Sequence, residues 1–201
     1  MARLAAEVDL AVLRAGREQD ATVLFADIRG FSTLCEDLPP REVAAFLEEF
    51  RSRAAQAIEA AGGFVDKFVG DEVMAVFGVP DPASRDADDA LAAGRMLAAA
   101  MRDWSREREA AGLTPVRIGI GIHRGPVFIG AIGADRVEVT AVGDTVNVAR
   151  RLEQMTRSLD CDCLASEAVA QAAAPGEATA VAVRKVRGRR GPLRIFAVEA
   201  A

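Results

Sequence analysis

The stretch Phe64-Val65-Asp66-Lys67-Phe68-Val69-Gly70-Asp71-Glu72-Val73-Met74-Ala75-Val76-Phe77 decides the fold of this chain of 201 residues. Two short apolar runs flank Gly70-Asp71, which is typical of a β-hairpin with a tight turn. Strict alternation places Lys67 on the same face as Val65 and Val69. A lysine there needs solvent or a specific acceptor, because burying an unpaired ammonium is costly. An ordinary turn with a snorkelling lysine is the simpler interpretation of the hairpin alone.

Composition restricts the class of protein. Hydrophobic residues make up 51% of the chain, enough for one domain with a substantial core and an extension. The net charge of −5 gives no global basic field for a nucleic acid polymer or an anionic membrane. No apolar run approaches the roughly 20 residues that span a bilayer, and the N-terminus lacks the apolar core of a signal peptide. We therefore expect a cytoplasmic protein with no membrane segment in this chain.

The residues usually considered for catalysis are sparse. His123, the only histidine, follows a Gly-Ile-Gly-Ile run, and no serine or cysteine is spaced to use it as a base. A structural role is therefore favoured over a catalytic one. Cys35, Cys161 and Cys163 form no disulfide framework, and we interpret them as reduced thiols. The remaining ionisable chemistry is carboxylate, lysine and arginine, which suits divalent metals and phosphates.

Hydrophobic periodicity predicts the order of the elements. Expected helices cover residues 2–18, 40–61, 86–110, 144–155 and 166–173. Expected strands cover residues 22–28, 64–69, 72–77, two glycine-rich segments of 116–130 joined near 124–126, and residues 138–142, 180–186 and 193–198. This order predicts an α+β fold with a ferredoxin-like βαββαβ core, added C-terminal strands and an antiparallel sheet flanked by helices. We divide the chain into an N-terminal linker or signalling helix (1–19) and one domain (20–201).

Two groups of polar residues follow from this topology. The first strand lies beside the hairpin, so Asp27 and Asp71 are expected to meet at one edge of the sheet. Two converging carboxylates repel each other unless a cation lies between them, which favours a metal site. Asn147 and Arg151 are four residues apart and project from one helical face. The glycine-rich strands bring little side-chain bulk near that face, which would suit an approaching ligand.

Four motifs in order resemble those of the class III nucleotide cyclase catalytic domain. They are Phe-Ala-Asp-Ile-Arg-Gly-Phe-Ser (25–32), Lys-Phe-Val-Gly-Asp-Glu-Val-Met-Ala-Val-Phe-Gly (67–78), Gly-Ile-His-Arg-Gly (121–125) and Thr-Ala-Val-Gly-Asp-Thr-Val-Asn-Val-Ala-Arg-Arg-Leu-Glu (140–153). The resemblance covers about residues 20–200. It implies an adenylate cyclase that converts ATP to 3′,5′-cyclic AMP and pyrophosphate by in-line attack of the ribose 3′-hydroxyl. It also implies a head-to-tail homodimer with shared active sites, each using two divalent cations, Mg²⁺ or Mn²⁺.

The resemblance assigns roles to particular residues. Asp27, Asp71 and the Ile28 carbonyl match the metal ligands of one subunit. From the other subunit, Lys67 and Thr140 match the positions that read the purine. Asn147 matches the residue that positions the ribose, and Arg151 the one that stabilises the transition state. Further matches are Phe31 as a substrate-binding position and Arg189 on the terminal phosphates, with Arg190 as its alternative and Arg136 as a weaker phosphate candidate.

Lys67 and Thr140 favour ATP within this resemblance. A lysine donor and a threonine acceptor complement N1 and the 6-amino group of adenine, whereas guanine presents the opposite pattern. Guanylyl cyclases resemble this chain except for an acid at the lysine position. Threonine where many members have aspartate marks a subgroup that includes bicarbonate-responsive cyclases.

Two other functions stay open at this point. The segment Val69-Gly70-Asp71-Glu72-Val73 imitates the Gly-Gly-Asp-Glu-Phe signature of diguanylate cyclases. A non-catalytic nucleotide-sensing or dimerisation module is the other alternative, although every catalytic position of the family is filled. An upstream sensor domain is a further expected partner, and nothing in the sequence names its signal.

Overall fold

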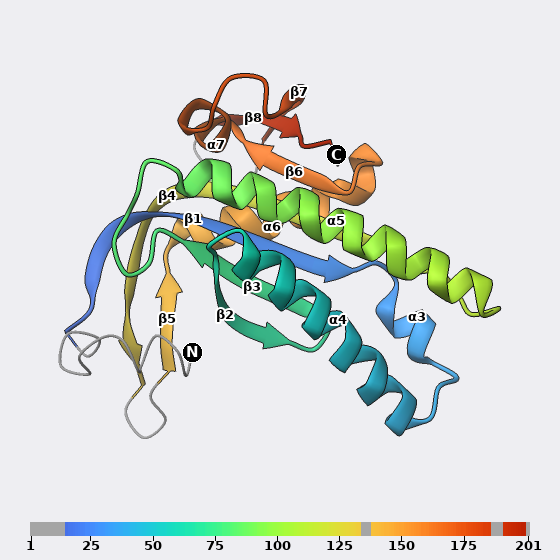
Figure 1. The fold of residues 1–201 in the computed structure, drawn as a ribbon. Coiled ribbons are helices and arrows are strands. Elements are labelled where there is room, and N and C mark those ends of the chain that lie inside the picture. The colour runs from blue at the N-terminus through green and yellow to red at the C-terminus, as the bar shows by residue number, and fades with distance from the viewer. Residues whose placement is uncertain (1–14, 134–137, 186–190, 200–201) are drawn as a thin grey trace.

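A computed structural model describes residues 15–133, 138–185 and 191–199. The elements in chain order are β1 (Arg17–Ile28), α3 (Phe31–Cys35), α4 (Pro40–Ala60), β2 (Phe64–Val69), β3 (Glu72–Phe77), α5 (Asp86–Ala110), β4 (Ile118–Ile132), β5 (Glu138–Val142), α6 (Asp144–Leu159), β6 (Cys163–Ser166), α7 (Glu167–Ala172), β7 (Thr179–Lys185) and β8 (Pro192–Ala197). The strands form one sheet with helices on both faces (Figure 1). The α+β class is therefore confirmed.

The strand order confirms the predicted core. Neighbouring strands follow the order β2-β3-β1-β4-β6-β8-β7, and β5 pairs with β4. The first four are the strands of the βαββαβ unit, with β1 between the hairpin and β4. The sheet is antiparallel except for the β4–β6 pair, which is parallel. The expected C-terminal strand pair is present as β7 and β8.

Two local expectations were wrong, and two short elements were not expected. Residues 17–18 belong to β1 and not to an N-terminal helix, while residues 1–14 lie outside the described part of the chain. The glycine-rich region forms one strand, β4, where two were expected. Pro126 stays in register with Asp20 of β1, and on the other edge of β4 it lies between the residues that pair with β6 and those that pair with β5, where no N–H is needed. The short elements α3 and β6 carried no periodic signal long enough to predict them.

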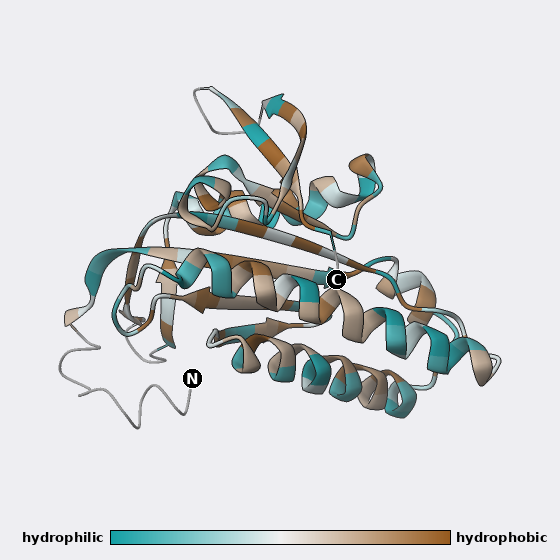
Figure 2. Cartoon of the chain, turned by 45° about the horizontal axis from the view of Figure 1, so that its top comes forward, coloured by the Kyte–Doolittle hydropathy of each residue, from teal (hydrophilic) through white to brown (hydrophobic). Residues whose placement is uncertain are grey.

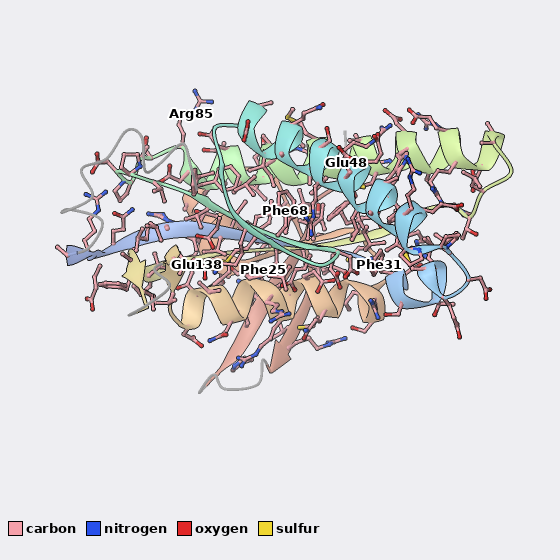
Figure 3. All side chains as sticks on the ribbon, turned by 90° about the horizontal axis from the view of Figure 1, so that it is seen from below. Phe25, Phe31, Glu48, Phe68, Arg85 and Glu138 are labelled. Carbon is pink, nitrogen blue, oxygen red and sulfur yellow. The ribbon has the colours of Figure 1, made fainter. Side chains whose placement is uncertain are left out.

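The two faces of the sheet have separate cores. Helices α4 and α5 cover one face, and α6 covers the other (Figure 3). Figure 2 shows long hydrophobic stretches on the central strands, whereas the helices carry bands of both colours. Fully buried side chains such as Phe50, Leu91 and Ile120 fill the first core. Each such side chain contributes about 1.5–3 kcal/mol of burial free energy.

The hairpin has the predicted turn but not the predicted alternation. Gly70 has φ of 61°, a left-handed conformation that glycine adopts without strain. A β-bulge lies between Val65 and Lys67, so that Val65 opposes Ala75 and Lys67 opposes Met74. The expectation that Lys67 and Val65 share a face is therefore wrong. Lys67 lies with Asp66 on the α6 side of the sheet, because Met74 belongs to the core on that side.

Helix α6 packs unusually close to β4. A Cβ atom on Gly121 would lie 2.2 Å from the Ala149 carbonyl oxygen and 2.2 Å from the Glu153 nitrogen. A Cβ atom on Gly119 would likewise lie 2.5 Å from Glu153 Oε1 and 2.6 Å from Thr156 Oγ1. The glycines therefore make room for the helix backbone. The interpretation that this sparse surface admits a ligand was wrong.

Candidate active site

Asp27 and Asp71 come together at one end of the sheet. Asp27 is the penultimate residue of β1 and opposes Glu72 across the β1–β3 pair, directly after the hairpin turn that carries Asp71. Burial raises the pKa of Asp27 from 3.8 to about 7, with further increases from a hydrogen bond with Asp71 and from the charges of Asp71 and Glu72. Two carboxyl groups held this close repel each other when ionised, and a cation between them would relieve that repulsion. The predicted convergence is thus confirmed.

The donor set at this end fits a hard divalent cation. Oxygen ligands suit Mg²⁺ and Mn²⁺, and Mg²⁺ is commonly held by one or two carboxylates together with substrate phosphates. Within the described residues there is no cluster of three histidine, cysteine or carboxylate side chains arranged around a metal position. Asp27 and Asp71 would therefore hold the cations with the Ile28 carbonyl, water and phosphate oxygens.

Helix α6 places charged residues against this carboxylate pair. Arg150 Nε lies 2.9 Å from Glu72 Oε2, and the Glu72 side chain is only 13% exposed. Burial raises the pKa of Glu72, whereas the charge and hydrogen bond of Arg150 lower it and the charge of Asp71 raises it. Arg150 was not among the predicted site residues, because adjacent arginines in one helix carry no signal that separates their faces.

Glu153 is a second residue that the sequence analysis missed. Its side chain is buried at 2% exposure beneath the carboxylate end of the sheet. Burial raises the pKa of Glu153 to about 7, and the charges of Asp27 and Glu72 add to that shift while Arg157 and Arg29 oppose it. Asp27, Glu72 and Glu153 are therefore three acidic groups at this site whose pKa the fold raises.

Asn147 and Arg151 project from one face of α6. They are four residues apart in this helix, so the common face predicted from the spacing is confirmed. Asn147 is exposed and Arg151 is partly exposed. Around the helix axis Asn147 lies about 60° and Arg151 about 100° from Arg150, which contacts Glu72, so both border the side of α6 that faces this chain's carboxylates.

Lys67 and Thr140 meet through Asp66. Thr140 Oγ1 donates to Asp66 Oδ2 at 2.7 Å, and Lys67 Nζ lies 3.5 Å from the same oxygen. Glu138 Oε1 lies 2.6 Å from Lys67 Nζ, and Glu138 belongs to β5, on the α6 side of the sheet (Figure 3). Burial lowers the pKa of Lys67, but the two carboxylates outweigh burial and raise it above the usual value.

The other predicted residues have different outcomes. Phe31 lies on α3, where its ring centroid is 6.0 Å from that of Phe46 and it packs against the first core. Arg189, Arg190 and Arg136 lie outside the described residues. His123 is buried at 4% exposure, and its Nδ1 lies 2.7 Å from Ser166 Oγ, as expected of a structural histidine.

The cysteines are all without disulfide bonds. Burial raises the pKa of the Cys163 thiol far above its ordinary value, and it also raises those of Cys161 and Cys35. These environments stabilise the protonated thiol and not the nucleophilic thiolate. Thiol chemistry is therefore disfavoured at all three positions.

The fold and the paired carboxylates define a βαββαβ domain with acidic residues at its hairpin. The family model for the adenylate and guanylate cyclase catalytic domain matches residues 13–198. The chain therefore belongs to this family.

Named relatives agree with that assignment. An adenylate cyclase of Anabaena cylindrica is 35% identical over 188 residues, which cover 89% of this chain and 36% of the relative. Adenylate cyclase 1 of Rhizobium meliloti (strain 1021) is 35% identical over 187 residues, which cover 92% of this chain and 28% of the relative. The chain thus spans about a third of the length of these relatives.

Solved structures show the same fold. The adenylyl cyclase CyaB from P. aeruginosa superposes with a TM-score of 0.85 at 31% identity, covering 92% of this chain and 96% of the other. The guanylyl cyclase Cya2 superposes with a TM-score of 0.83 at 30% identity, covering 92% of this chain and 94% of the other. Over the described residues, no helix has the length and apolarity needed to cross a membrane.

Proposed function

We propose that this chain is an adenylate cyclase domain, which forms 3′,5′-cyclic AMP and pyrophosphate from ATP at sites shared by two copies. The observation that carries the proposal is the convergence of Asp27 and Asp71 beside α6, with a hydrogen bond between their carboxyl groups. Membership in the cyclase family and the two relatives named adenylate cyclase support it. The protein is expected to work in the cytoplasm, under a sensor supplied by another segment or partner.

Asp27, Asp71 and the Ile28 carbonyl would hold the cations. When bound, two divalent cations would supply activation of the ribose 3′-hydroxyl and neutralisation of the phosphate charge. Glu72 supports Asp71 from the adjacent position and is itself held by Arg150. Because the carboxylates already lie together, no large rearrangement of β1 or the hairpin is needed to receive cations.

The second copy would supply the groups that orient the nucleotide. Asn147 would position the ribose, and Arg151 would place a fixed cation where charge grows on the phosphoryl oxygens. Asn147 is exposed and Arg151 is partly exposed, as side chains that reach into a site completed by the other copy would be. Such an arrangement is a head-to-tail dimer with two equivalent sites. We place Phe31 at the substrate-binding side and Arg189 on the terminal phosphates.

The choice of ATP depends on Lys67 and Thr140. The two solved structures above are an adenylyl and a guanylyl cyclase at nearly equal similarity, so overall likeness does not select the base. Lys67 offers a donor and Thr140 an acceptor, the complement of N1 and the 6-amino group of adenine. Guanine would place N1–H against the lysine and an oxo group against the threonine.

A product assay tests this function. The chain is incubated with Mn²⁺ and either ATP or GTP, and the products are separated chromatographically. Cyclic AMP from ATP in preference to cyclic GMP from GTP is expected. Formation of cyclic di-GMP would establish the diguanylate cyclase alternative, and nucleotide binding without any cyclic product would establish the non-catalytic one.

A further inference from the structure

Asp66 is a buried carboxylate between the two residues that would read the base. It is the residue displaced by the β-bulge of β2, and only 4% of it is exposed. Its Oδ2 accepts the Thr140 hydroxyl at 2.7 Å and lies 3.5 Å from Lys67 Nζ. It also accepts a hydrogen bond from the backbone N–H of Ala141. Burial raises the pKa of Asp66, and the hydrogen bonds from Thr140 and Ala141 and the charge of Lys67 oppose that increase only in part.

A threonine hydroxyl alone does not distinguish adenine from guanine. The group can donate its hydrogen or accept one, and its hydrogen rotates to suit the ligand. In this structure Asp66 takes the hydrogen, because the 2.7 Å contact is short and the other acceptor near the hydroxyl among the described residues, the Ala141 carbonyl oxygen, lies at 3.5 Å. The oxygen of Thr140 therefore remains as an acceptor for a ligand.

The surroundings of the Asp66 carboxylate are mostly apolar. Asp66 and Thr140 border a small gap of about 10 Å³ whose remaining walls are apolar, Phe64, Val76 and Ile129 among them. A carboxylate in such a place is costly unless its oxygens are hydrogen-bonded. Among the described residues, the polar partners of Asp66 are the Thr140 hydroxyl, the Lys67 ammonium and the Ala141 backbone N–H.

The same carboxylate restricts Lys67. An ammonium has three N–H donors. Glu138 lies 2.6 Å from Nζ and Asp66 lies 3.5 Å from it, so two of the N–H groups have carboxylate acceptors. Because the three N–H groups are arranged tetrahedrally, these two contacts fix the direction of the third. One donor from Lys67 and one acceptor from Thr140 then face a ligand as a fixed pair.

We propose that Asp66 is the positioning residue that sets base specificity, by committing the Thr140 hydroxyl to act only as an acceptor beside the Lys67 donor. This inference rests on the proposed function of the same site. The favoured base is a purine with an amino group next to an unprotonated ring nitrogen. A purine with an oxo group next to a ring N–H is disfavoured. Its oxo group would face the Thr140 oxygen, also an acceptor, and its ring N–H would face the Lys67 ammonium, also a donor.

The test compares Asp66→Ala and Thr140→Val with the unmodified chain. The ratio of kcat/KM for ATP to that for GTP is measured with Mn²⁺, and binding of α,β-methylene ATP and α,β-methylene GTP is measured by calorimetry. Without Asp66 the hydroxyl can donate to the oxo group of guanine, so the ratio is expected to fall about tenfold, the effect of one hydrogen bond. It should not invert, because Lys67 still opposes the guanine N1–H.

The double variant separates a positioning role from a structural one. If Asp66 acts through the Thr140 hydroxyl, Asp66→Ala has little further effect on the ratio in the Thr140→Val background. Thr140→Ser keeps the hydroxyl and should keep the ratio. Equal ratios in the unmodified chain, Asp66→Ala and Thr140→Val would overturn the inference, as would additive losses in the double variant.

Two controls make the outcomes distinct. Thermal unfolding shows whether Asp66→Ala folds, and if it does not, Thr140→Val against Thr140→Ser decides the matter through the same ratio. If the unmodified chain neither forms a cyclic nucleotide nor binds either analogue, the proposed function fails. If it prefers ATP and the variants keep that preference, only the role of Asp66 fails.

Discussion

Replacing Asp27 by asparagine is expected to stabilise the metal-free protein while removing its metal-dependent activity. Asp27 has a pKa of about 7 in the fold against 3.8 for the unperturbed group, chiefly through burial and then through Asp71 and Glu72. At pH 8 the fold must hold it ionised next to other carboxylates. Asparagine removes that charge at similar size.

The size of this effect follows from the pKa shift. A shift of one unit corresponds to about 1.4 kcal/mol, so the full shift of Asp27 would correspond to roughly 4 kcal/mol. Asp27 is partly exposed and its carboxyl group is hydrogen-bonded to that of Asp71, so solvent screening and relaxation reduce the expected gain to about 1–2 kcal/mol at pH 8. For a domain of this size that is an increase in Tm of roughly 2–8 °C.

The pH dependence has a definite sign. A carboxyl whose pKa is raised on folding binds its proton more tightly in the folded state, so stability falls as pH rises from about 4 through about 7. The advantage of Asp27→Asn is therefore complete above pH 7 and shrinks to about a third near pH 5. Urea unfolding in EDTA at pH 8 and pH 5 measures both values.

Two comparisons complete this experiment. Asp37→Asn, at an exposed carboxyl, should change stability by less than about 0.5 kcal/mol. Added Mn²⁺ should raise the Tm of the unmodified chain and not that of Asp27→Asn, because only a site that binds the cation gains stability from it. A variant no more stable than the unmodified chain at pH 8, or one with a larger advantage at pH 5, would refute the reasoning.

Three further predictions follow from packing and charge. Gly121→Ala should lower the free energy of unfolding by about 1–3 kcal/mol or more, because its Cβ would lie 2.2 Å from backbone atoms of α6; an unchanged Tm would contradict the close packing of α6. Arg150→Ala should cost about 1–3 kcal/mol in urea unfolding at pH 8, because it leaves the largely buried Glu72 unpaired, and an additional Glu72→Gln should recover part of that loss; a loss that Glu72→Gln does not reduce would exclude the ion pair as its cause. Lys67→Ala should lower kcat/KM for ATP about tenfold or more, because a charged donor to the base is removed, and equal values for variant and unmodified chain would contradict a role in base recognition.

The sequence was sufficient for features with a local signal. The hairpin turn at Gly70-Asp71, the α5 helix and the meeting of Asp27 with Asp71 follow from period, turn chemistry and the order of the elements. The face occupied by Lys67 was wrong because the bulge at Asp66 depends on the register with β3, which one strand does not specify. Glycines in β4 were misread for a related reason, since a strand alone does not reveal what packs on it.

Charge placement was the hardest feature to predict. Asn147 and Arg151 were selected correctly as one helical face, but the contact of Arg150 with Glu72 depends on how α6 is rotated against the sheet. Asp66 showed no sign of importance in the sequence, because its burial and its bond with Thr140 join residues 74 positions apart. Such long-range polar contacts become visible only once the strands are paired.

The shared active site is the central claim, and subunit mixing tests it most directly. Asp71→Ala and Arg151→Ala are each expected to be nearly inactive in cyclic AMP formation from ATP with Mn²⁺. In an equal mixture after subunit exchange, half of the dimers are mixed and each contains one intact site, so roughly a quarter of the original activity should return. No recovery despite demonstrated exchange would contradict the claim that each site is built from two copies.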